Sequence, residues 1–225
     1  MINKKKILII AAHPDDEALG CGGTIIKLKE KCEIFTIFMT DGVSSRKSNK
    51  KKKERKIRRE ACTKLFKFLK IKKPIFLNLP DNQLDKVPLL KIVKKIEKYL
   101  YKINPDEVFT HYENCLNIDH KITFQATITA CRPIKKLNIQ KILSFEIPSS
   151  TDWSLSKKTF NPNYFINITN QISKKINALK YYKMELREDP HSRSLNSIKA
   201  LAKIRGASCG VMFAEAFFIN RIIDK

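Results

Sequence analysis

The fold is decided by the stretch Lys6-Ile7-Leu8-Ile9-Ile10-Ala11-Ala12-His13-Pro14-Asp15-Asp16-Glu17. The five apolar residues from Ile7 to Ala11, rich in β-branched isoleucine, predict a strand that is buried on both faces. Pro14 has no backbone N–H and pushes the residue before it into an extended conformation, so the strand must end here. The sequence therefore predicts a buried strand that opens directly into a cluster of polar side chains.

These polar side chains predict a metal site. His13 and Asp16 are three residues apart and can turn toward one point beyond the carboxyl end of the strand. An imidazole nitrogen and a carboxylate oxygen are common zinc ligands, and Asp15 between them is free to accept the proton of a metal-bound water. The alternative is a plain strand-to-helix turn capped by Asp16 or Glu17. Two adjacent carboxylates repel each other unless a cation or a proton is near, which favours the metal.

Strands and helices alternate along the rest of the chain. Further strands are predicted at residues 33–40, 75–79, 107–110, 141–146 and 164–167. Helices are predicted at residues 18–28, 49–70, 87–101, just after His120, at 171–187 and up to Arg205. This alternation predicts an α/β, Rossmann-like fold with a mostly parallel sheet, helices on both faces and a C-terminal flank. Because no linker-like stretch or repeat appears, we expect residues 1–225 to form one domain.

Several helices have faces that predict how they pack. The helix at 49–70 has apolar residues at helical spacing, and so does the helix at 87–101. The predicted inward residues are Ile57, Ala61, Leu65, Phe68 and Leu69 in the first, and Leu90, Val93, Ile96 and Leu100 in the second. The glycines at 20, 22 and 23 favour close approach of the backbone to the metal site or to a neighbouring element.

A second polar segment supplies a third candidate ligand. In open parallel sheets the site lies beyond the carboxyl ends of the strands, where the strand order reverses. Four polar residues follow predicted strand ends: His13, Asp41, Asp81 and His111. His120 begins the helix that follows and completes a His-Asp-His set with His13 and Asp16, which is typical of a catalytic zinc site with one open position. Taken alone, Asp119-His120 before a helix would indicate a cap, and His111 a structural role.

Charge leaves several partner classes open. The chain has 225 residues and a formal net charge of +23, from 45 lysines and arginines against 22 aspartates and glutamates. Such a charge suits a nucleic acid, an anionic membrane or a phosphorylated substrate, and it equally suits a lysine-rich solvated surface. The densest basic run, residues 47–59, lacks the interleaved aromatic residues that stack on bases. We therefore expect no nucleic-acid partner, while attraction for anionic sugar conjugates stays open.

The remaining composition favours a cytoplasmic protein. No apolar run reaches the roughly 18 residues of a transmembrane helix, and the first apolar run is too short for a signal peptide. The six cysteines are scattered without a Cys-x-x-Cys pair, which favours reduced thiols over disulfides. The sequence does not indicate an oligomeric state.

The motifs resemble a known family. Ala12-His13-Pro14-Asp15-Asp16-Glu17, followed by Gly22-Gly23-Thr24 and much later by Asp119-His120, resembles the PIG-L/LmbE-like deacetylases. That family includes the enzyme that de-N-acetylates N-acetylglucosaminyl-phosphatidylinositol and the deacetylases of the mycothiol and bacillithiol pathways. The resemblance spans most of the chain. It implies zinc held by His13, Asp16 and His120, Asp15 as general base, and acetate and a free amino sugar as products.

The same resemblance implies substrate-binding residues. Arg58 and Asp81 match positions that contact sugar hydroxyls in related enzymes. His191, in Pro-His-Ser-Arg-Ser, matches a C-terminal histidine region and would close over the substrate. The plainer alternatives are a solvated basic helix for Arg58, a turn for Asp81 and a surface turn for His191.

One position departs from the family pattern. Mycothiol-type members have a histidine three residues before the last ligand that helps to stabilise the oxyanion, and here that position is Asn117. An asparagine can donate one hydrogen bond to an oxyanion but carries no charge. Oxyanion stabilisation would then depend on Asn117 together with zinc, His191 or His111. Asp119 would orient its neighbours.

Taken together, the sequence predicts a zinc-dependent deacetylase of an N-acetyl amino-sugar conjugate. The segment at 145–153 looks like that of relatives encoded with glycan biosynthesis, so a nucleotide- or lipid-linked sugar is a plausible small-molecule partner by analogy. A small thiol precursor is a further option. A metal hydrolase of another amide or ester, and a basic nucleic-acid-binding protein with an inert metal site, are the alternatives.

Overall fold

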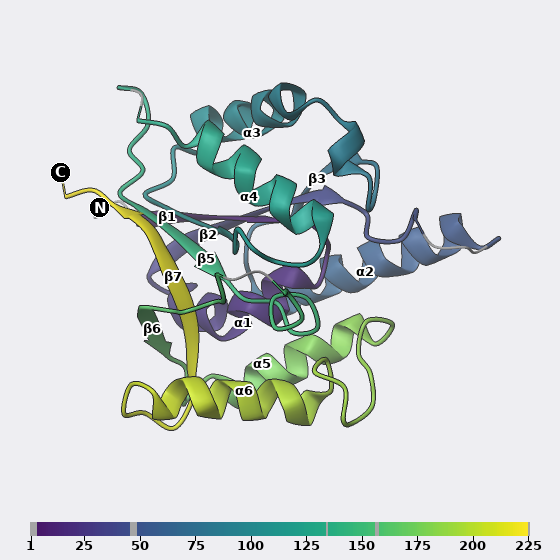
Figure 1. Ribbon diagram of the computed structural model, residues 1–225, viewed down its shortest axis with the longest axis vertical. Helices are drawn as coiled ribbons and strands as arrows, with labels where there is room; N and C mark the ends of the chain where they lie inside the picture. The colour runs from purple at the N-terminus through teal and green to yellow at the C-terminus, as the bar shows by residue number, and fades with distance from the viewer. Residues whose placement is uncertain (1–3, 46–48, 134, 156–157, 225) are drawn as a thin grey trace.

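The computed structural model describes residues 4–45, 49–133, 135–155 and 158–224, and it is built on one sheet (Figure 1). The strands are β1 (Lys5–Ala11), β2 (Cys32–Thr40), β3 (Ile75–Leu79), β4 (Glu107–His111), β5 (Lys141–Phe145), β6 (Tyr164–Asn167) and β7 (Ala214–Ile222). Their order across the sheet is β3-β2-β1-β4-β5-β7-β6. The first five strands run parallel, and β7 is antiparallel to both β5 and β6. The predicted α/β fold with a mostly parallel sheet is confirmed.

Helices cover both faces of the sheet (Figure 1). They are α1 (Asp16–Leu28), α2 (Lys51–Leu69), α3 (Leu89–Ile103), α4 (Ile118–Ala130), α5 (Ile172–Leu179) and α6 (Leu195–Ala207), with short 3₁₀ turns η1 (Leu84–Lys86) and η2 (Lys180–Tyr182). α3 and α4 lie on one face and α1 and α2 on the other, while α5 packs against α1 and α6 against β7. Within the described residues, no helix is both long and apolar enough to cross a bilayer.

The central strand β1 is buried on both faces, as its sequence predicts. Ile7 and Ile9 belong to the core between the sheet and α1, whereas Leu8 and Ile10 belong to the core under α3 and α4. Successive side chains of a strand point to opposite faces, so a strand with helices on both sides needs an unbroken apolar run. β1 pairs with β2 on one side and β4 on the other. The strand order therefore reverses at β1, and its carboxyl end is where a site is expected.

Helix α1 is interrupted at Cys21, whose backbone is not helical. The amides of Gly23 and Thr24 begin a second helical segment and donate to the two carboxylate oxygens of Glu215 on β7, at 2.8 and 2.7 Å. Lys175 on α5 pairs with Glu215 at 2.5 Å, so the buried carboxylate is neutralised. The last strand thus holds the first helix in place.

The expected close approach of the glycines is confirmed at two positions. A Cβ atom on Gly20 would lie 2.4 Å from Cδ2 of Phe145, and one on Gly23 would lie 2.8 Å from Cδ1 of Ile168. Gly22 has room for a methyl group, with its nearest neighbour at 3.5 Å. The glycines therefore serve packing of α1 against neighbouring elements.

The structure corrects several predicted details. The helix predicted at 171–187 ends as α5 and η2 by Tyr182, because Tyr182 turns inward to a buried glutamate. Three predicted core residues are exposed: Ile57, Phe68 and Leu90. On α2 the buried stripe includes Arg58, which pairs with buried carboxylates, so the helix is rotated away from Ile57. Residues 47 and 48 of the basic run lie outside the described residues.

Candidate active site

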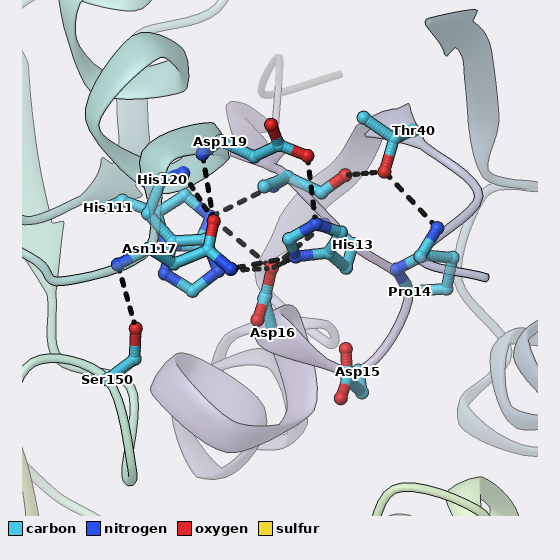
Figure 2. Close-up of polar contacts among 12 residues, drawn as sticks. His13, Pro14, Asp15, Asp16, Thr40, His111, Asn117, Asp119, His120 and Ser150 are labelled. Carbon is cyan, nitrogen blue, oxygen red and sulfur yellow. Dashed lines mark hydrogen bonds and ion pairs between the residues drawn. The ribbon is translucent and has the colours of Figure 1, made fainter. Parts of the chain in front are cut away.

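Three of the four histidines meet one carboxylate at the carboxyl end of the sheet (Figure 2). His13 follows β1, Asp16 begins α1, His111 ends β4, and His120 lies in the first turn of α4. Oδ2 of Asp16 lies 3.3 Å from Nδ1 of His13 and 3.5 Å from Nε2 of His120. Nδ1 of His13 and Nε2 of His120 are 3.3 Å apart. The structure thus brings together the three residues that the sequence predicts as metal ligands.

The donor set of His13, Asp16 and His120 fits a divalent metal ion. All three side chains are buried, and their three ligand atoms lie within 4.8 Å of one another. Oδ1 of Asp16 is buried and has no hydrogen-bond partner among the described residues, which is costly unless something else satisfies it. Two imidazoles and a carboxylate are the ligand types that zinc prefers. An ion held between these three atoms would relieve the crowding of acceptors there.

The charges of these side chains also favour binding of a metal ion. Burial alone would raise the pKa of Asp16, but the imidazoles of His120 and His111 lower it well below its usual value. Burial lowers the pKa of His120 well below its ordinary range, whereas carboxylates from Asp119, Asp16 and Asp81 outweigh burial and raise that of His13. A buried carboxylate that stays ionised beside a neutral imidazole is the state that binds a cation.

A second group of possible ligands shares His13. Nε2 of His13 lies 3.3 Å from Oδ1 of Asp81 and 3.2 Å from Oδ2 of Asp119. These two carboxylates are already satisfied, because backbone amides of Asn82 and Leu84 donate to Asp119 and the hydroxyls of Thr40 and Ser45 donate to Asp81. Such contacts are typical of carboxylates that fix the orientation of a ligating histidine. Asp81 and Asp119 therefore orient His13 in this structure.

His120 is positioned by the start of α4. Oδ1 of Asn117 accepts hydrogen bonds from the amides of Asp119 and His120 at 2.8 and 3.3 Å, which makes Asn117 the helix cap. Its Nδ2 donates to Oδ1 of Asn82 at 3.2 Å. On the far side of the imidazole, Nδ1 of His120 contacts the thiol of Cys115 at 3.1 Å. The backbone and the second ring nitrogen of His120 are thus both held.

His111 supports the cluster from behind. Its ring stacks on that of His120 with centroids 3.9 Å apart, and it contacts the edge of Phe145. Nε2 of His111 accepts a hydrogen bond from the amide of Ala12 at 2.9 Å. Because that nitrogen is already an acceptor, His111 shapes the turn after β1, in line with its predicted structural role.

Asp15 lies beside the cluster in a strained backbone conformation. Its φ of 142° is rare for a residue with a side chain, and such strain is often concentrated at functional sites. The side chain is buried between two guanidinium groups, with Oδ1 2.6 Å from Arg58 and Oδ2 3.2 Å from Arg193. Burial raises the pKa of Asp15 to about 6, although both arginines oppose the shift. A carboxyl group with such a pKa can both accept and donate a proton near neutral pH.

Glu17 holds the strained turn. Its Oε2 accepts a hydrogen bond from the amide of Asp15 at 3.0 Å, and a 2.7 Å hydrogen bond joins Oε1 to the hydroxyl of Tyr182. Burial raises the pKa of Glu17 to about 8. Tyr182, which is distant in sequence, therefore supports the turn that contains Asp15 and Asp16.

Other predicted site residues lie in different settings. Arg58 is buried and donates to Asp15 and to backbone carbonyls, so its guanidinium faces the protein. His191 is exposed, and its Nδ1 accepts a hydrogen bond from the amide of Arg193. Asp41 shapes the loop after β2 and pairs with Arg55 at 2.6 Å, away from the imidazoles. Roles in substrate binding for Arg58, Asp81 and His191 stay predictions.

Sequence reasoning missed three residues that complete the site: Cys115, Tyr182 and Arg193. Tyr182 gave no signal, because it lies in an ordinary amphipathic helix pattern. Arg193 stands in the Pro-His-Ser-Arg-Ser segment, and that segment drew attention only for its histidine.

The chain is similar to known deacetylases in sequence and in fold. The chain is 30% identical over 189 residues to "Uncharacterized deacetylase YaiS" of Escherichia coli, covering 80% of this chain and 92% of that one. It is 26% identical over 220 residues to a diacetylchitobiose deacetylase of Thermococcus kodakarensis, covering 94% of this chain and 81% of that one. The solved N,N'-diacetylchitobiose deacetylase of Pyrococcus horikoshii, in complex with an inhibitor, superposes with a TM-score of 0.77 at 26% identity, covering 96% and 84% of the two chains.

A family model covers the part of the chain that holds the cluster. Residues 8–131 match the PIG-L model, described as GlcNAc-PI de-N-acetylase, and this range contains His13, Asp16 and His120. Because the match covers more than half of the sequence, the chain belongs to the PIG-L family of deacetylases.

Proposed function

We propose that this chain is a zinc-dependent hydrolase that removes the N-acetyl group from an N-acetyl amino-sugar conjugate. The observation that carries the proposal is the meeting of Nδ1 of His13, Oδ2 of Asp16 and Nε2 of His120, which lie 3.3 to 3.5 Å from one another. Asp15 lies next to this set along the chain, with a buried carboxylate whose pKa is raised. Ligands and base are thus supplied by adjoining residues.

The proposed ligands of the ion are His13, Asp16 and His120. A divalent ion bound there supplies a Lewis acid that polarises the acetamide carbonyl and lowers the pKa of water to about 7. Zinc is preferred to magnesium or calcium, because two of the three donors are imidazoles.

Asp15 performs the proton transfers in the proposed reaction. Its carboxylate takes a proton from the attacking water as the oxygen of that water bonds to the acetamide carbon. The protonated Asp15 then gives the proton to the amide nitrogen as the C–N bond breaks, so acetate and a free amine leave. Arg58 keeps the carboxylate oriented from its buried side at 2.6 Å. A pKa of about 6 suits a group that must serve in both directions.

The substrate is proposed to be a sugar conjugate that carries negative charge. Relatives are named for N-acetyl sugar substrates, among them diacetylchitobiose. The start of α2 is basic and exposed, and there Arg55 pairs with Asp41 and Lys51 donates to the carbonyl of Ser44. The surrounding lysines favour an anionic group, such as a phosphate of a nucleotide- or lipid-linked sugar. The free thiols of all six cysteines support a cytoplasmic location.

A substrate panel tests the proposal. Purified protein, loaded with zinc or stripped with chelator, is incubated with N-acetylglucosamine conjugates and with simple esters and amides, and released acetate is measured. We expect zinc-dependent acetate release from one or more sugar conjugates, and a loss of at least about 100-fold in Asp15→Asn. Asp85→Asn, an exposed aspartate in η1, is the control. Release from esters only would favour another hydrolase, and full activity of Asp15→Asn would rule out the mechanism.

A further inference from the structure

Two arginines hold the carboxylate of Asp15, and they differ in what else they contact. Arg58 is buried with every nitrogen engaged by the protein. Its Nε donates to the carbonyl of Pro14 at 2.8 Å, and its Nη1 donates to the carbonyl of Gly42 at 2.5 Å and pairs with Glu185. Nη2 is left for Oδ1 of Asp15, at 2.6 Å. Arg58 is therefore a fixed support, because each of its three nitrogens is engaged by the protein.

Arg193 is held firmly only at Nε. Its Nε donates to the hydroxyl of Ser149 at 2.7 Å and, more weakly, to the carbonyl of Pro148 at 3.3 Å. Nη1 lies 3.2 Å from Oδ2 of Asp15, a longer contact than the one that Arg58 makes. Nη2 has no partner within the described part of the chain, and the side chain is 20% exposed. The guanidinium of Arg193 is therefore fixed at Nε, makes a weak contact with Asp15 through Nη1, and has N–H donors on Nη2 that are free within the described residues.

The other residues considered as oxyanion donors, Asn117, His111 and His191, are placed differently from Arg193. The amide of Asn117 caps α4 and donates to Asn82. Nε2 of His111 accepts from the amide of Ala12, and its Nδ1 is buried without a partner among the described residues. His191 is exposed, and its Nδ1 accepts from the amide of Arg193. None of these three residues contacts the carboxylate of Asp15 within the described part of the chain. Arg193 does.

We propose that Arg193 is the cation of this site that contacts the acyl group. When the site is empty, Arg193 holds Oδ2 of Asp15. When an N-acetyl group is bound, Arg193 donates to the acyl oxygen. This inference rests on the proposed deacetylase function. Oδ2 must be freed to take the proton of the attacking water, and the long 3.2 Å contact is the weaker of the two that hold the carboxylate. The displaced guanidinium then faces the oxygen on which negative charge develops, where an oriented cationic donor is most effective.

Acetate is the probe, because it is the product of every substrate in the class and needs no knowledge of the conjugate. The zinc-loaded wild type, Arg193→Gln, Arg193→Lys and a control, Arg132→Gln, are titrated with acetate by calorimetry or by ¹³C NMR line broadening. Arg132 is exposed and its Nε contacts only the end of its own helix. Zinc content and the far-ultraviolet circular dichroism spectrum are measured for each variant, and kcat and KM are measured with the best substrate of the panel.

We expect Arg193→Gln to bind acetate at least tenfold more weakly and to lose about 100-fold in kcat, with zinc content and fold unchanged. Arg193→Lys keeps the positive charge but lacks the forked donors of a guanidinium. We expect its acetate affinity and kcat to lie between those of the wild type and Arg193→Gln. Acetate affinity within twofold of wild type would overturn the proposal even if kcat fell, because Arg193 would then act on Asp15 alone. Loss of zinc in both variants would also overturn it. If the wild type released no acetate from any substrate, the proposed function would fail, while the titration would still decide the role of Arg193.

Discussion

The thiol of Cys115 lies 3.1 Å from Nδ1 of His120, on the side of the ring away from Asp16. Histidine ligands usually donate their second ring N–H to a carboxylate or a carbonyl. Sulfur is a weaker acceptor, and here it is buried against the hydroxyls of Ser150 and Thr151. Burial raises the pKa of the Cys115 thiol, so it stays neutral. His120 is thus oriented by a soft partner.

Removal of this thiol is predicted to weaken metal binding. Cys115→Ala leaves Nδ1 of His120 without its partner, and we expect zinc affinity to fall about tenfold, the lower end for loss of such a group. Competition with a coloured chelator measures it. Cys209→Ser, at an exposed cysteine, is the matched control. Equal affinities for Cys115→Ala and the control would show that the thiol has no orienting role.

The structure predicts one zinc ion per chain. The second possible group, around Asp81 and Asp119, is already satisfied by protein donors, whereas Oδ1 of Asp16 has none among the described residues. Elemental analysis after dialysis should give one equivalent. Asp16→Asn is expected to lose the ion, and Asp81→Asn to retain one equivalent with about 10-fold to 100-fold weaker affinity. Two equivalents in the wild type would contradict this.

Glu17 predicts how stability depends on pH. The unfolded carboxyl ionises near 4.5, while the buried one keeps its proton up to about 8. Between these values the unfolded state binds fewer protons than the folded state, so stability falls as pH rises, by about 1.4 kcal/mol per pH unit from this group.

Glu17→Gln should flatten this decline in the free energy of unfolding. Urea unfolding is measured at pH values from about 5 to about 8, the window set by the unfolded and folded pKa values of Glu17. Glu30→Gln, at an exposed glutamate, should leave the slope as it is in the wild type. Parallel slopes for wild type and Glu17→Gln would mean that Glu17 is ionised in the folded protein.

Two glycines of α1 form a matched pair for packing. A methyl group on Gly20 would collide with the ring of Phe145, while one on Gly22 meets only ordinary contacts. We expect Gly20→Ala to lower the free energy of unfolding by about 1–3 kcal/mol. Gly22→Ala is expected to be neutral or to stabilise by up to about 1 kcal/mol. Urea unfolding of both variants checks this, and equal destabilisation would contradict the packing argument.

The elements that sequence predicts well are those fixed by local pattern. The unbroken apolar run of β1 and the alternation of strands and helices are enough to give a parallel sheet. The rule that carboxyl ends of parallel strands share an edge then brings His13 and His111 together. His120 follows because its helix starts at the same edge. Little of this depends on the details of packing.

What sequence could not predict depends on contacts between distant segments. The orientation of α2 is set by Arg58, because a buried guanidinium meets Asp15 and Glu185, and apolar periodicity alone favoured Ile57. Arg193 contacts Asp15 although the two residues are 178 positions apart in the sequence. Such pairs leave no local pattern, since each arginine looks like an ordinary surface charge in its own segment.

The tie between Glu215 and the second half of α1 has a consequence for how the protein matures. Two of the proposed ligands, His13 and Asp16, emerge from the ribosome early and His120 follows about halfway along the described chain. The strand β7, which steadies α1 and lies inside the sheet between β5 and β6, is made after all three. A nascent chain short of residue 215 has an open sheet edge and an uncapped helix. Stable metal capture is therefore expected only after β7 has been made and has joined the sheet.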